Sequence, residues 1–364
     1  MRYLLLILAA LCQLPADAQL TIYGVGDPAT AAVQHLSGPN VLLSNAYSQT
    51  ITPQQIGVFS DSTASMGLDS GLVISTGIVH GLVGPNNIPN LTAGGGFQAY
   101  DAEIATMSPL YPGTMFDPGI VVMDLVPAGD TLEVTYVFGS EEYDEYACSD
   151  KDDRFGLFLS GPGIQGPFTN GAVNIARLPI SNLPITVNTL NRGMAGAQGN
   201  LGLCNMNPGW LMDTIYYINN DFGLNTQLDA YSVVLTARTI VQPGALYQLK
   251  IAIADINDGN FDSAVFFPEG GIRCSDLSTN AQDLGDLHAP GLWVQDGLVL
   301  ARGLNDGDPV QFEVFDPTGR LLLRTNAVRH GAIWCVPLSS TFNGMVLLRA
   351  TQGAQVVTGK VFVR

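Results

Sequence analysis

Alternating apolar and polar positions are the dominant pattern along this chain, and they predict β-strands. In residues 131–138, Leu132, Val134 and Tyr136 alternate with polar side chains, as expected for a strand with one buried face. Long helical periods between the strands are missing, which argues against a parallel sheet with crossover helices. We therefore predict an all-β protein, whose main part is a large antiparallel β-sandwich, jelly-roll-like, with minor helices.

Two turns with strong sequence signals are predicted to close β-hairpins. The first, at residues 127–130, would join a strand at 120–126 to the alternating strand just described. The second, at residues 242–245, has Pro followed by Gly at its centre, which suits a type II turn. It would join strands at 231–241 and 246–254.

Two short segments are predicted as helices. Asp27 is a suitable N-cap, Pro28 suits the first helical position, and Gly38 would end the helix. A second helical patch is expected within residues 98–107.

The first residues have the features of a signal peptide. Arg2 precedes an apolar run at residues 4–11, and Ala16 and Ala18 are the small residues that a signal peptidase recognises. The apolar run is too short to span a bilayer as a helix, and no later stretch is long and apolar enough. We expect a signal peptide at 1–18, cleavage before Gln19, and a mature chain without a transmembrane segment, secreted or held on the outer cell surface.

The remaining chain is expected to form two parts. Residues 19–274 would be the large β domain, and the polar, small-residue composition of 275–290 is typical of a linker. Residues 291–364 contain short strands separated by turns, and they predict a small Ig-like β-sandwich with its last strand at the chain end.

Charge and cysteine content narrow the expected partners and compartment. The formal net charge is −17, so neither nucleic acid nor an anionic membrane is an expected partner. Cys12 leaves with the signal peptide, and the four other cysteines would reach an oxidising compartment. Cys148 and Cys204 both lie in long polar loops, and they are our preferred disulfide, while Cys274 and Cys335 could pair or stay free.

Two acidic loops follow predicted strands and are candidates for a calcium site. Residues 139–154 contain seven carboxylates, and a second acidic segment spans 255–263. Calcium takes six to eight oxygen ligands, which such loops can supply. The candidate ligands are Glu141, Glu142, Asp144, Asp255, Asp258 and Asp262. The alternative is a solvated acidic face that binds no ion.

Signals for catalysis are weak. Carboxylates from the two acidic loops, such as Glu142 with Asp255, could form the pair of a glycosidase, but their separation is unknown. The four histidines are scattered, there is no G-x-S-x-G motif, and the Gly-rich stretches lack the Lys of a phosphate-binding loop. We therefore expect no enzymatic activity and no cofactor other than calcium.

A series of motifs resembles the choice-of-anchor L domain of secreted and surface bacterial proteins, over residues 30–271. The motifs are GLDSGLVISTG (67–77), GPNN (84–87), YVFGSEEY (136–143), FGLFLSGPG (155–163), YYINN (216–220), LKIAIAD (249–255) and DSAVF (262–266). The resemblance implies a β-rich domain fused to a C-terminal anchoring or sorting signal. It implies a location rather than a chemistry.

The C-terminal part resembles the sorting domain of type IX secretion. The similar segments are VFDPTGRLL (314–322), GMVLLR (344–349) and GKVFVR (359–364), although LWVQD (292–296) replaces the usual Pro-Asn-Pro opening. This resemblance implies that the secretion machinery binds this module, and that the protein is released or attached to surface polysaccharide.

The sequence thus predicts an exported, non-enzymatic surface or secreted protein that functions in binding or adhesion. One alternative is a carbohydrate-binding module or glycan-active enzyme that uses the acidic loops. Another is a structural component of the surface matrix.

Overall fold

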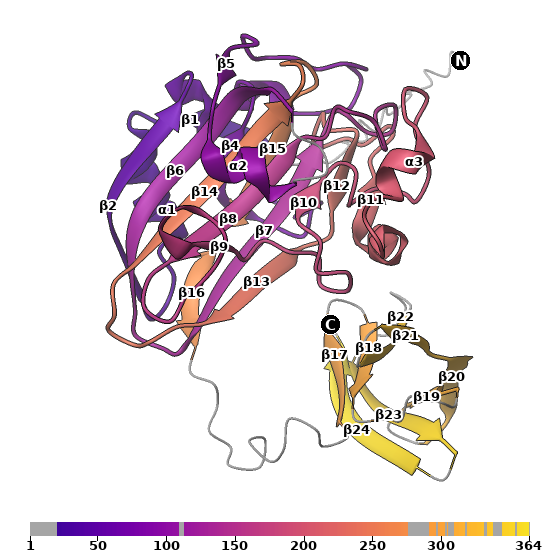
Figure 1. Cartoon of the computed structure of the whole chain (residues 1–364). Helices are drawn as coiled ribbons and strands as arrows, with labels where there is room; N and C mark the ends of the chain where they lie inside the picture. The colour runs from indigo at the N-terminus through magenta and orange to yellow at the C-terminus, as the bar shows by residue number, and fades with distance from the viewer. Residues whose placement is uncertain are drawn as a thin grey trace, which may run out of the picture. The chain divides into compact units, whose positions relative to one another are not determined.

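A computed structural model describes two parts of the chain (Figure 1). The described residues are 20–108, 113–275, 291–295, 298–302, 304, 309–316, 319–330, 333–337, 344–353 and 355–363. The chain divides after Ser275 into two compact units, which are taken separately below. The predicted signal peptide, its cleavage site and nearly all of the predicted linker lie outside the described residues.

The first unit is built from two antiparallel β-sheets. One sheet has the order β1 (Thr21–Gly24), β3 (Ile56–Ser60), β4 (Ser70–Ser75), β15 (Ser263–Pro268), β7 (Thr131–Ser140), β12 (Ala230–Ser232) and β11 (Tyr217–Asn219), and β13 (Leu235–Ile240) and β16 (Ile272–Ser275) also pair with β7. The other has the order β10 (Ile185–Thr186), β8 (Arg154–Ser160), β14 (Tyr247–Ile256), β6 (Met115–Pro127) and β2 (Val41–Thr50), with β5 (Gln98–Ala99) on β6 and β9 (Val173–Asn174) on β8. The predicted all-β, antiparallel class is confirmed.

Aromatic side chains join the two sheets face to face. Phe155 on β8 is fully buried, and its ring centroid lies 5.0 Å from that of Tyr136 and 6.5 Å from that of Phe138, both on β7. It also meets Phe267 on β15, edge to face, at 6.1 Å. Since Phe155 comes from one sheet and its partners from the other, this contact marks the core of a β-sandwich.

Both predicted hairpins are wrong. β6 pairs with β2, β5 and β14, whereas β7, which follows it, pairs with strands of the other sheet. β13 likewise pairs with β7, while β14 pairs with β6 and β8. Each predicted turn therefore crosses from one sheet to the other. The two crossings lie side by side, because the Gly244 N–H donates to the Pro127 carbonyl at 2.7 Å.

The helices are short. α1 (Pro28–Leu36) begins at the predicted N-cap, where the Asp27 carboxylate accepts from the Ala29 N–H. α2 (Ala102–Met107) occupies only the end of the second predicted helical patch, since β5 forms at its start. The others are α3 (Leu201–Cys204) and the 3₁₀ helices η1 (Pro53–Gln55), η2 (Val79–Leu82), η3 (Thr169–Gly171) and η4 (Trp210–Tyr216). Within the described residues, every helix is too short or too polar to cross a membrane.

The second unit contains two four-stranded antiparallel sheets. One has the order β17 (Gly291–Gln295), β18 (Leu298–Arg302), β22 (Ile333–Pro337) and β21 (Val328–His330), and the other β20 (Leu321–Asn326), β19 (Gln311–Phe315), β23 (Gly344–Gln352) and β24 (Gln355–Val363). Val299, Phe312 and Trp334 belong to one buried cluster that both sheets share. β24 pairs with β23 as far as Val363, so the strand predicted near the chain end is present.

Candidate functional site

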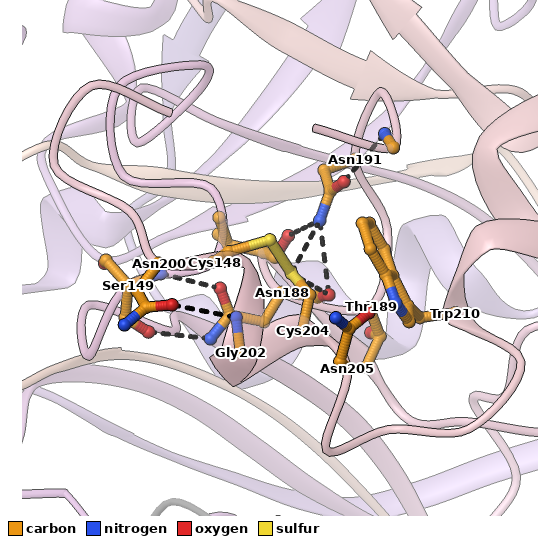
Figure 2. Close-up of a disulfide and its surroundings, with 12 residues drawn as sticks. Cys148, Ser149, Asn188, Thr189, Asn191, Asn200, Gly202, Cys204, Asn205 and Trp210 are labelled. Atoms are coloured by element: carbon orange, nitrogen blue, oxygen red, sulfur yellow. Dashed lines mark hydrogen bonds between the residues drawn. A yellow bond between two sulfur atoms is a disulfide. The ribbon is translucent and has the colours of Figure 1, made fainter. Parts of the chain in front are cut away.

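The loop between β7 and β8 is tied to a second long loop by the predicted disulfide. Cys148 and Cys204 are bonded and buried, and Trp210 packs beside them (Figure 2). The two loops also pair through their backbones, since the Asn200 N–H donates to the Cys148 carbonyl at 2.7 Å and the Gln198 N–H to the Glu145 carbonyl at 2.8 Å. Cys274 and Cys335 are free and buried.

Asn188 lies near the disulfide and is hydrogen-bonded to the same loop (Figure 2). Its side chain accepts from the Ser149 N–H at 3.1 Å and donates to the Ser149 carbonyl at 2.8 Å, while its own N–H donates to Asp152 at 2.9 Å. A buried network of this kind holds the loop backbone in one conformation.

A polar pocket of about 610 Å³ opens beside this loop. It is lined by Asn86, Asn87, Pro89, Tyr143, Asp144, Glu145, Arg192, Ala197, Asp221, Phe222 and Asp229. These residues come from four separate segments, and hydrogen bonds join them. The Asn86 amide, for example, donates to Asp229 at 2.9 Å, and the Asn86 N–H donates to the Gly223 carbonyl at 2.8 Å.

The pocket is acidic, although one of its carboxylates is paired. Asp144 accepts from Arg192 at 2.7 Å and from the Tyr217 hydroxyl at 2.5 Å. Burial raises the pKa of Asp229 to about 7, and the neighbouring Glu145, Asp221 and Asp144 add to this by repulsion, against the hydrogen bond from Asn86. Negative charge on a ligand would therefore be disfavoured here.

Phe222 presents an aromatic surface at the pocket. Its side chain is 91% exposed and its backbone is left-handed, with φ of 63°. A large residue in this conformation is uncommon, and an exposed aromatic ring at a pocket is a typical binding surface.

Deeper in the sandwich, carboxylates from the β7–β8 loop, the end of β14 and the β14–β15 loop meet in the interior. We call Glu142, Asp152, Asp153, Asp255 and Asp262 the buried acidic cluster, since each is at most 1% exposed. Asp152 and Asp153 come directly before β8, Asp255 is near the end of β14, and Asp262 precedes β15. These positions meet because β8 pairs with β14 and β15 pairs with β7.

Only part of the cluster is satisfied by hydrogen bonds. Asp153 accepts from the Ser263 hydroxyl at 2.6 Å and the Ile256 N–H at 3.1 Å, and Asp262 accepts from the Ala93 N–H at 2.6 Å. Among the described residues, both oxygens of Asp255 and of Glu142 have no hydrogen-bond partner. The nearby Thr76 hydroxyl is engaged with Ser263 instead. Unpartnered buried carboxylates are costly and need an explanation.

Burial dominates the electrostatics of this region. It raises the pKa of Asp255 well above its ordinary value, and repulsion from Asp153 and Asp262 raises it further. Burial likewise raises the pKa of Glu142 and of Asp153. The pKa of Asp262 rises to about 7 through burial, with a contribution from Asp117.

The structure separates the predicted calcium ligands. Glu142, Asp255 and Asp262 belong to the cluster, and Asp258 is paired with Lys151 at 2.9 Å. Asp144 instead lines the pocket. Glu141 is buried between the two regions: one oxygen accepts from the Leu91 N–H, and burial, Asp229 and Asp262 raise its pKa to about 9.

Other residues of the two regions were not predicted as site residues. Asp152 and Asp153 are in the same acidic run as Glu142, but the sequence does not show which carboxylates of that run face inward. Glu142 and Asp255, paired in the glycosidase alternative, are 0% exposed, so a glycan cannot reach them in this structure. No group of three or more Asp, Glu, His or Cys side chains within the described part of the chain is arranged to hold a metal ion.

Comparisons with known proteins identify a domain family. The family model of the choice-of-anchor L domain matches residues 30–273. The sequence matches no curated protein.

Solved structures give only a distant likeness. A β-glucuronidase from Ruminococcus gnavus in complex with D-glucaro 1,5-lactone is 11% identical, with a TM-score of 0.17, over 88% of this chain and 45% of that chain. The apo form of that enzyme gives 11% identity and a TM-score of 0.17, over 88% of this chain and 46% of that one. The chain thus spans less than half of these proteins, and such low TM-scores support no statement about activity.

Proposed function

The chain belongs to the choice-of-anchor L domain family, and from this premise we propose that it is a surface or secreted protein that binds a glycan in its acidic pocket. The pocket that combines Phe222 with amide and carboxylate acceptors carries this proposal. Family membership supports the location, and the pocket supports the binding role.

The side chains of the pocket suit a ligand with many hydroxyl groups. Asn86, Asn87, Glu145 and Asp221 offer oxygen acceptors, and the Asn87 amide can also donate, whereas the Asn86 amide already donates to Asn220 and Asp229. The exposed ring of Phe222 can stack on the apolar face of a sugar, which adds affinity without charge.

The charge of the pocket selects among glycans. Asp221, Asp229 and Glu145 face the same space, and Arg192 is already paired with Asp144. A uronic acid or sulfated sugar would place another negative charge beside these carboxylates. The expected ligand is therefore a glycan without acidic groups.

We predict that Phe222→Ala weakens glycan binding roughly tenfold, the effect of losing one aromatic stacking surface. The measurement is calorimetric titration of the mature chain with neutral, N-acetylated and uronic-acid oligosaccharides. Tyr100→Ala is the matched control, because Tyr100 is also exposed (76%) but does not line the pocket. Unchanged affinity in Phe222→Ala, or equally tight binding of uronic-acid oligosaccharides, would contradict the proposal.

We also propose that the C-terminal unit directs export, as its resemblance to the type IX sorting domain implies. Deletion of residues 292–364 is expected to leave the processed protein in the periplasm, with nearly complete loss from the surface and the medium. Cell fractionation and protease accessibility of intact cells measure this. The same residues fused to a periplasmic reporter should carry that reporter outward, and surface display of the truncated chain would refute the sorting role.

A further inference from the structure

The acidic pocket has more carboxyl groups than cations to pair with them. Its one basic lining residue is Arg192, and its acidic lining residues are Asp144, Glu145, Asp221 and Asp229. Arg192 pairs with Asp144 at 2.7 Å, and within the described part of the chain no salt bridge reaches the other three. The pocket therefore presents three carboxyl groups that have no cationic partner in the described chain.

The chain holds these three groups close to one another. The Glu145 carbonyl accepts from the Gln198 N–H at 2.8 Å, and the Asp229 carboxylate accepts from the Asn86 amide at 2.9 Å. Burial raises the pKa of Asp229, and repulsion from Glu145 and Asp221 contributes to the rise, so the groups interact across the pocket. A positive charge placed among them would relieve this repulsion.

We propose that the preferred ligand of the pocket is a glycan with a free amino group, such as an oligosaccharide of glucosamine, whose ammonium binds the carboxylates of Glu145, Asp221 and Asp229. This inference rests on the proposed function and narrows it to one class of sugar. An ammonium has three N–H donors and no acceptor, and its hydrogen bonds to carboxylates are strengthened by charge. N-acetylation removes the charge and leaves a single N–H, so the pocket should distinguish the two forms.

The aromatic ring at the pocket favours an organic cation over an inorganic one. Phe222 directly follows Asp221 in the chain, and both line the pocket. A sugar stacked on the ring is therefore beside a carboxylate, and the face of the ring itself attracts a cation. The Asn87 amide can donate to a sugar hydroxyl. A metal ion would use neither feature, and the described Asp, Glu, His and Cys side chains include no group of three placed to hold one.

The test is calorimetric titration of the mature chain with tetramers of glucosamine and of N-acetylglucosamine, at about pH 6, where an amine carries its proton. At low salt the free-amine tetramer should bind roughly tenfold more tightly, because only it carries the charge. This advantage should shrink at about 0.5 M NaCl, since salt screens exposed charges. Asp221→Asn and Glu145→Gln should each bring the two affinities within about threefold of each other. Both side chains are exposed, so both variants should fold.

Asp69→Asn is the matched control, because Asp69 is also acidic and exposed but does not line the pocket. This variant removes the same charge and should keep the full advantage of the free-amine tetramer. The proposal is overturned if the wild type binds both tetramers equally, if the advantage survives in both pocket variants, or if an oligolysine peptide of the same charge binds as tightly. Binding of the N-acetylated tetramer alone would refute the amine preference and leave the proposed glycan function standing, whereas binding of neither tetramer would refute both.

Discussion

Replacing Cys148 and Cys204 together by alanine is expected to lower the free energy of unfolding of the first unit by about 4 kcal/mol. The disulfide closes a chain segment with a sequence separation of 56, and breaking it gives the unfolded chain much more conformational freedom. The loops it joins have little other core: the buried cluster around it consists of the two cysteines and Trp210, with Leu183 and Ala195 packed against it. The measurement is a urea titration followed by hydrogen exchange in peptides from β7 and β8, which reports the unfolding of the first unit alone.

The double replacement Cys274→Ala and Cys335→Ala is the matched control, because both cysteines are buried but free. It should lower the free energy of unfolding of the first unit clearly less, since it removes two buried thiols, of which only Cys274 lies in that unit, and opens no covalent loop. If the unfolding midpoint of the first unit in wild-type protein is unchanged by a reductant that opens the Cys148–Cys204 bond, the bond does not stabilise the fold as argued.

The disulfide could be predicted from the sequence, because both cysteines lie in loops that need a covalent link. The pairing of the strands could not be predicted. An alternating pattern shows which face of a strand is buried, but not which strand lies beside it. The turn before Thr131 fits a hairpin as well as a crossing between sheets. The choice between a hairpin and a crossing depends on how the apolar faces of β6 and β7 pack across the core. That packing is a property of the two sheets together and not of the turn sequence.

The acidic loops were recognised from the sequence, but their division into two regions was not. Asp144 and Glu142 are two residues apart, yet Asp144 reaches Arg192 in the pocket while Glu142 is buried in the cluster. The pocket itself depends on a contact between Asn86 and Asp229, which are 143 residues apart in the chain. Neither feature has a local sequence signal, since both follow from loops that the sandwich brings together.

Phe155→Ala is expected to destabilise the first unit by about 4 kcal/mol, within the range for a large aromatic removed from a core. Phe155 meets Tyr136, Phe138 and Phe267, so its loss would leave a cavity between the two sheets. These neighbours lie on rigid strands and can relax only partly into that space, which adds a cavity cost to the lost burial. The same urea and hydrogen-exchange measurement applies.

Phe222→Ala is the matched control for this core substitution, because it removes the same side chain from a position that is 91% exposed. It should unfold at the same urea concentration as the wild type. A change in its glycan affinity can then be assigned to the lost ring and not to unfolding. If Phe155→Ala lowers the free energy of unfolding by less than about 1 kcal/mol, the two sheets must move together and fill the cavity. The contacts of Phe155 with the opposite sheet would then not be a main source of the stability of the first unit.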